Sequence, residues 1–150
     1  MDERASGLKT AEMWDRLFKA PSIRTFIGEN TSEFGLTAFS AYISEICLSM
    51  GEVPGRVIRR ANVERSFGHQ IFRGTRNPSR DTVLQLAFGL GADVRLAQSL
   101  LKHAGHSALY PRIERDLAIG YCLHHQMSLV ETQAVLEELG LPLIGSAPSR

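Results

Sequence analysis

Several features are scarce or missing in this chain of 150 residues, and each absence excludes a class of protein. There are only two cysteines, Cys47 and Cys122, too few for a disulfide framework. No apolar run is long enough to cross a membrane as a helix, and residues 1–4 carry two acids where a secretory leader carries bases. We therefore expect a cytoplasmic protein whose cysteines are buried, reduced thiols inside helices.

The residue patterns that carry catalysis are also absent. The sequence has no phosphate-binding glycine loop, no nucleophile elbow and no pair of carboxylates in a pocket setting. Four histidines, His103, His106, His124 and His125, could meet if two helical hairpins stacked, but neighbouring histidines point apart on a helix and no acid or thiolate has ligand spacing. We predict that the chain is no enzyme and has no metal site and no cofactor.

Alternation of polar and apolar residues, the pattern of a half-buried strand, is missing as well, and apolar residues recur at helical spacing instead. Thr37 is the predicted N-cap of a helix with one continuous apolar stripe, formed by Phe39, Tyr42, Ile43, Ile46, Cys47 and Met50. Ser79 and Asp93 are the predicted caps of two later helices. The sequence predicts an all-α protein with seven helices between Thr37 and Gly140 and one or two before Asn30.

Negative charge is nearly missing from the segment between Val53 and Arg80. Its one acid, Glu64, stands against seven arginines: Arg56, Arg59, Arg60, Arg65, Arg73, Arg76 and Arg80. The segment therefore carries a net charge of +6, and because the whole chain carries +1, the remainder carries −5. A nearly neutral protein that gathers its cations in one short segment is typical of proteins that bind a polyanion, most often nucleic acid.

Two short helices are predicted within this basic segment. The first begins at Pro54, whose missing N–H is harmless in a first turn, and stops at Asn62, which tolerates the left-handed conformation. The second runs from Glu64 to Arg73, and Gly74 closes it before the turn-forming residues 77–78. Two short helices joined by a tight turn form a helix-turn-helix, whose second helix enters the DNA major groove.

The segment from Ala61 to Asp81 resembles the phage-repressor-like (XRE/Cro) helix-turn-helix DNA-binding family. Shared features are an alanine and an aliphatic residue before the second helix, a glycine-x-arginine turn, an x-proline-serine run, and a following helix that ends on Leu90-Gly91. The resemblance covers roughly residues 37–105. It implies a five-helix repressor-like core, sequence-specific binding of double-stranded DNA and a role as a transcriptional regulator.

The same resemblance assigns the contacts to DNA. The positions that read base edges in the family correspond to Arg65, Ser66, His69 and Gln70. Phosphate contacts are expected from the arginines around and before the second helix, namely Arg56, Arg59, Arg60, Arg73, Arg76 and Arg80. Some of these arginines are expected only to lie over the core.

Four positions depart from the family pattern. Val53 and Pro54 replace a polar cap and a phosphate-binding glutamine, Glu64 replaces a serine or threonine cap, and Gly68 replaces an aliphatic residue. Glu64 is expected to contribute only a favourable charge at the helix start. These departures leave an alternative function open, a protein-binding adaptor on a repressor-like scaffold.

A weak internal repeat follows the basic segment. Arg80-Asp81 and the residues Ala87, Asp93, Gln98, Leu101 and Gly105 recur 35 positions later as Arg115-Asp116, Cys122, Ser128, Gln133, Leu136 and Gly140. The pattern indicates a helical hairpin used twice, or a coincidence between two amphipathic helix pairs. In the second hairpin, Pro111 is expected at a helix start, and Ser128 with Glu131 as a capping box.

The N-terminal residues predict two more helices, separated at residues 20–22. Their apolar positions, Met13, Trp14, Leu17, Phe18, Ile23, Phe26 and Ile27, either pack on the core of the same chain or form an exposed contact surface. The predicted organisation is an N-terminal helical extension (1–36), a helix-turn-helix domain (37–105), a C-terminal helical hairpin packed on it (106–144) and a tail (145–150). We expect a homodimer, formed through the N-terminal helices or the second hairpin.

Overall fold

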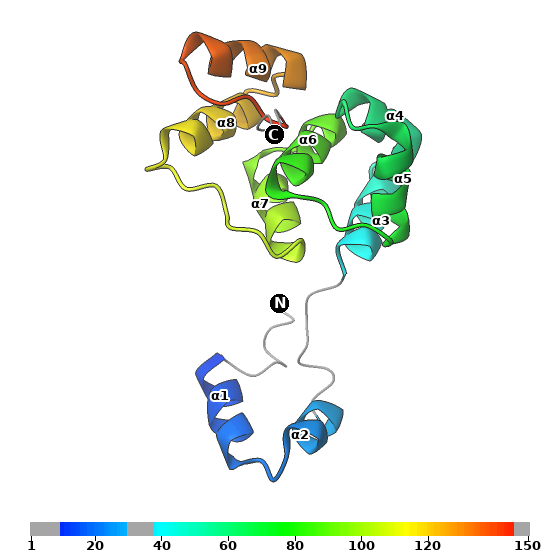
Figure 1. Ribbon diagram of the computed structural model, residues 1–150, viewed down its shortest axis with the longest axis vertical. Coiled ribbons are helices and arrows are strands. Elements are labelled where there is room, and N and C mark those ends of the chain that lie inside the picture. The colour runs from blue at the N-terminus through cyan, green and yellow to red at the C-terminus, as the bar shows by residue number, and fades with distance from the viewer. Residues whose placement is uncertain (1–9, 30–37, 146–150) are drawn as a thin grey trace, which may run out of the picture. The chain divides into compact units, whose positions relative to one another are not determined.

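The computed structural model describes residues 10–29 and 38–145, and in these ranges it contains nine helices and no strand (Figure 1). Helices α1 (Thr10–Lys19) and α2 (Ile23–Glu29) belong to one compact unit. The second unit contains α3 (Phe39–Ser49), α4 (Pro54–Arg60), α5 (Arg65–Arg73), α6 (Arg80–Leu90), α7 (Val94–His103), α8 (Glu114–His124) and α9 (Leu129–Glu138). Over the described residues, the predicted all-α class and the predicted helices are confirmed.

Side-chain caps start most of the helices in the second unit. The Ser79 hydroxyl accepts a hydrogen bond from the Thr82 amide at 3.1 Å, and the Asp93 carboxylate accepts one from the Leu96 amide at 2.9 Å. Ser128 and Glu131 form the predicted capping box, with bonds of 3.1 and 2.9 Å. These three predictions are confirmed because a cap and its target amide lie only three residues apart in the sequence.

Of two other predicted helix starts, one lies outside the described residues and the other is wrong. Thr37 lies outside them, and the N-cap of α3 is Ala38, which makes no side-chain hydrogen bond. Pro111 does not begin a helix, since α8 begins at Glu114. The Ile113 amide instead donates to the Tyr110 carbonyl at 2.9 Å, so Pro111 occupies the second position of a turn, another place where its fixed φ is favoured.

Helix α6 lies at the centre of the second unit. All of its residues from Val83 to Leu90 are buried, because α4, α7 and α9 pack around it. Gly89 allows α4 to approach closely, since a Cβ at this position would lie 2.4 Å from the Val57 carbonyl oxygen. Gly68 has the same role between α5 and α4, because its Cβ would lie 2.6 Å from the Ile58 side chain.

The internal repeat of 35 residues appears in the structure as repeated hydrogen bonds. The Gln98 amide group exchanges bonds of 3.0 and 2.7 Å with the Leu109 backbone. Gln133 exchanges bonds of 2.7 and 2.9 Å with the backbone of Ile144, 35 residues beyond Leu109. Equivalent contacts at a constant offset argue against coincidence, so α6–α7 and α8–α9 are two copies of one helical hairpin (Figure 1).

Candidate nucleic-acid interface

Helix α5 carries the candidate interface, and Glu64 fixes where this helix begins. The two carboxylate oxygens of Glu64 accept hydrogen bonds from the Phe67 amide at 2.8 Å and the Ser66 amide at 3.2 Å. These bonds lower the pKa of Glu64. The expectation that Glu64 contributes only its charge is therefore wrong, because the longer side chain folds back and caps the helix.

The turn between α4 and α5 is held by a side chain from α6. Asn62 adopts a positive φ of 57° in this turn, as its predicted tolerance of the left-handed region allows. The Gln85 amide nitrogen donates to the carbonyl oxygens of Ala61 and Asn62 at 3.0 and 3.2 Å. Gln85 is buried and was not among the predicted site residues, although it is the one polar residue within the apolar run from Val83 to Leu90.

Five of the seven arginines in the basic segment expose their guanidinium groups. Within the described residues, no hydrogen bond or ion pair engages the side chains of Arg56, Arg59, Arg65, Arg73 and Arg76. Arg56 and Arg59 on α4 line a groove of about 600 Å³ together with Arg65 and His69 on α5. The structure thus brings cations of both helices to one side of the α4–α5 pair.

The other two arginines are occupied by protein groups. The Arg60 guanidinium donates to the Gly89 carbonyl at 2.9 Å and pairs with Glu52 at 2.9 Å. Arg80 pairs with the buried Asp116 at 2.9 Å and donates to the carbonyls of Ser107 and Ala108, at 3.0 Å each. Both were candidates for phosphate contacts, and the structure gives both of them intramolecular partners.

The four candidate base-reading residues lie along the first two turns of α5. Arg65 and Ser66 are exposed on the first turn, whereas His69 and Gln70 lie one turn further and are half-buried. A second groove, of about 390 Å³, is lined by Glu64, Arg65, Ser66, His69 and Arg73. Residues four apart share a helix face, so Arg65 lies beside His69, and Ser66 beside Gln70.

The histidines have separate surroundings. His103 stacks on Tyr42 with ring centroids 3.7 Å apart, and the Nε2 of His106 lies 2.8 Å from the Pro78 carbonyl oxygen. His124 and His125 lie edge to face on each other at the end of α8. Across residues 10–29 and 38–145, no three His, Cys, Asp or Glu side chains gather closely enough to hold a metal ion.

Both cysteines are free and buried in helices, as predicted. Burial raises the pKa of the Cys47 thiol, and the negative charge of Glu52 raises it further. In the part of the chain that the structure describes, no helix has the length and apolarity needed to span a membrane.

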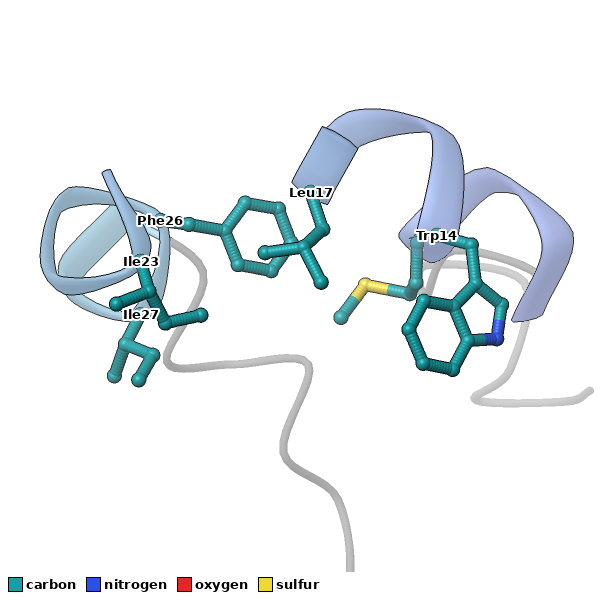
Figure 2. Close-up of a pocket in the computed structure, with 6 residues that line it drawn as sticks. Trp14, Leu17, Ile23, Phe26 and Ile27 are labelled. Carbon is teal, nitrogen blue, oxygen red and sulfur yellow. The ribbon is translucent and has the colours of Figure 1, made fainter. Parts of the chain in front are cut away.

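The α1–α2 unit exposes apolar side chains around a groove of about 490 Å³ (Figure 2). Trp14 and Leu17 contribute to it from α1, and Ile23, Phe26 and Ile27 from α2. Phe26 is the one buried residue of the two helices, and Trp14 is more than half exposed. Such an apolar surface is typical of a contact site for another surface.

Comparison with known proteins adds no assignment, since no protein-family model, no curated protein and no solved structure matches this chain.

Proposed function

We propose that this chain binds double-stranded DNA in a sequence-specific manner through a helix-turn-helix made of α4 and α5, and acts as a transcriptional regulator. The observation that carries the proposal is the set of five exposed arginines around α5 that have no partner among the described residues. The one acid among them, Glu64, uses its carboxylate to cap α5. The resemblance to the repressor-like family supports α3 to α7 as the five-helix core that presents α5 to the major groove.

Each side chain has a defined role in this proposal. Arg65 projects from the first turn of α5, where a guanidinium can donate two hydrogen bonds to the O6 and N7 of guanine. Gln70 can pair with the N6 and N7 of adenine, and Ser66 and His69 complete the base-reading set. The phosphate contacts come from Arg56 and Arg59 on α4, Arg73 on α5 and Arg76 beyond Gly74.

This proposal does not include Arg60 and Arg80 among the residues that bind phosphates. Arg60 joins α4 to α6 through Gly89, and Arg80 joins α6 to α8 through Asp116. A guanidinium that already donates to a carboxylate and to backbone carbonyls would lose those bonds on turning to a phosphate. Both residues therefore position the interface and do not touch DNA.

The test compares Arg65→Ala with Arg76→Ala. Arg65→Ala should remove a base contact, which costs roughly 1–3 kcal/mol on the preferred site, selected from random sequences, and little on random DNA. Arg76→Ala should remove a phosphate contact, which weakens binding to all duplexes alike and lowers the salt slope by about one. Fluorescence titrations with both duplexes at two salt concentrations measure these differences.

Arg95→Ala is the matched control, because Arg95 is an exposed arginine on α7, outside the basic segment. This variant should bind both duplexes as the parent does. The five exposed arginines of the basic segment form what we call the arginine surface. If Arg65→Ala and Arg76→Ala fold normally and also bind DNA like the parent, the arginine surface binds something other than DNA.

A protein-binding adaptor is the second candidate function. The observation that favours it is the exposed apolar groove of α1 and α2, a surface that suits a protein partner better than DNA. This function would become the leading proposal if the parent protein failed to bind any duplex at low salt.

A further inference from the structure

The exposed face of α8 is apolar at its centre and polar at its two ends, where Glu114 and His124 lie. Ile113 at the N-cap, Leu117 and Tyr121 recur at a spacing of four residues, and Leu117 and Tyr121 are 54% and 61% exposed. The Tyr121 ring leans on His125, with centroids 4.2 Å apart. Leu117, Gly120 and Tyr121 border a groove of about 430 Å³ whose far wall includes Val94 of α7.

The internal repeat shows what an equivalent face does in the first hairpin. Gly120 and His124 stand 35 residues after Gln85 and Gly89, two of the positions where α4 and its C-terminal turn contact α6. Tyr121 likewise corresponds to Leu86, which is fully buried. The face that a short helix covers on α6 is thus exposed on α8. Among the described residues, no atom outside the local backbone of α8 lies within 4 Å of the Cβ position at Gly120.

The order of residues along α8 makes this face complementary to itself. If two copies of α8 pack antiparallel with the twofold axis at the level of residue 119, residues whose numbers lie equally far from 119 face each other. The Ile119 side chain itself is buried on the opposite side of the helix. Leu117 then lies opposite Tyr121 of the second copy, and Glu114 in the acidic first turn lies opposite His124 in the basic last turn. Apolar groups meet at the centre, and a carboxylate meets an imidazole at both ends.

We propose that a second copy of this chain docks on this face, through an antiparallel α8–α8 contact with twofold symmetry. Gly120 lets the two helices approach closely at the centre, and each Tyr121 ring fills the groove beside the other copy's Leu117. Because α8 has only 11 residues, the contact is smaller than the roughly 800 Å² per partner of a standard interface. We therefore expect a weak and reversible dimer.

This dimer does not depend on the arginine surface binding DNA. It does place its contact in the same compact unit as α4 and α5, so the two α5 helices of a dimer are held by folded structure. Failure of the dimer would leave DNA binding by a monomer intact, and failure of DNA binding would leave the dimer intact. The two proposals are distinguished by measuring association without DNA.

The first test is sedimentation equilibrium of the full chain across the micromolar range. The parent should show a reversible dimer. Tyr121→Glu and Leu117→Glu should each weaken association by at least roughly tenfold, because a carboxylate would be buried at the centre of the contact. Val130→Glu is the matched control, since Val130 is apolar and even more exposed but lies on α9, and this variant should associate like the parent.

A second test uses charge exchange to check the antiparallel register. Glu114→Lys and His124→Glu should each weaken the dimer, and the double variant should regain the parent's association. A parent that stays monomeric at every concentration would overturn the proposal. So would a dimer that dissociates with Trp14→Glu in the α1–α2 unit and persists with Tyr121→Glu.

Discussion

Gly68 and Gly89 lie where α5 and α6 come closest to α4, and they differ in what a side chain would meet. At Gly68 a Cβ would contact the Ile58 side chain, which is buried and branched at its Cβ and can yield only by a small shift. At Gly89 a Cβ would contact the backbone oxygen of Val57, which is held in place by helix α4. A glycine inside a helix is usually unfavourable by about 0.5–1 kcal/mol relative to alanine. At Gly89 the close approach of two helices outweighs that cost.

We therefore predict that Gly89→Ala lowers the free energy of unfolding by about 2 kcal/mol through overpacking. Gly68→Ala should have a smaller effect, because the Ile58 side chain can shift more readily than the Val57 backbone, while both variants gain the same helix propensity. Urea denaturation followed by circular dichroism measures both changes. Gly55→Ala is the control without a close neighbour, and an equal loss in all three variants would contradict the packing argument.

Asp81 shows how a residue's protonation depends on its partners. Burial by itself would raise its pKa, but hydrogen bonds from the Arg115 guanidinium and the Gly145 amide outweigh burial and leave the pKa lowered. A lowered folded-state pKa means that the charged form contributes stability above the ordinary value of 3.8. That stability is lost as the pH falls through the folded-state value.

The expected pH dependence follows from this shift. The free energy of unfolding of the parent should decline as the pH falls below 3.8, more steeply than that of Asp81→Asn, which has no such proton to gain. Denaturant titrations over a series of acidic pH values give both curves. Parallel curves would show that Asp81 does not contribute to acid unfolding.

At the scale of helices, the two hairpins are joined by reciprocal ion pairs. Arg80 of the first hairpin pairs with Asp116 of the second, and Arg115 of the second pairs with Asp81 of the first. Both arginines also donate to backbone carbonyls 27 and 28 residues further along, at Ser107 and Ala108 for Arg80, and at Pro142 and Leu143 for Arg115. The two hairpins are therefore related by an approximate twofold axis.

The two acids of this arrangement should not be equivalent in stability. Asp116 is 4% exposed and accepts bonds from Arg80 and the Tyr110 amide, whereas Asp81 is 31% exposed. Asp116→Ala should cost about 3 kcal/mol, because it leaves a half-buried guanidinium without its partner. Asp81→Ala should cost less, and chemical denaturation that ranks the two variants in the opposite order would contradict this account.

Local features of the sequence were sufficient to predict the helices but not their contacts. The caps at Ser79, Asp93 and Ser128 are correct because their partners are near neighbours in the chain. The partner of Arg80 lies 36 residues away, so the position of Arg80 after the second helix indicated a phosphate contact and not an ion pair. The repeated Arg-Asp pair was the available clue, since two such pairs can exchange partners when two hairpins stack.

In the candidate interface, too, local features could be predicted from the sequence, whereas contacts between distant residues could not. The basic segment and the two short helices were visible in the sequence, because charge and helix ends are local properties. The role of Gln85 was not, because a glutamine in an apolar helix gives no indication of which carbonyls it will meet. Which of the seven arginines remain unpaired depended equally on contacts between distant helices.

At the scale of the molecule, the second unit combines two surfaces of different chemistry. The α4–α5 pair gathers exposed arginines, and α8 exposes Leu117 and Tyr121. The proposed functions of these surfaces, binding DNA and binding a second copy, are compatible. A dimer would present two copies of α5, as binding to a palindromic site requires.

The most direct measurement for the DNA-binding proposal is the salt dependence of binding to a random duplex, followed by fluorescence. With about four of the unpaired arginines contacting phosphates, the affinity of each chain should fall roughly hundredfold between about 50 and 200 mM salt. Association that is absent at low salt, or that does not change with salt, would contradict the proposal that the arginine surface binds DNA.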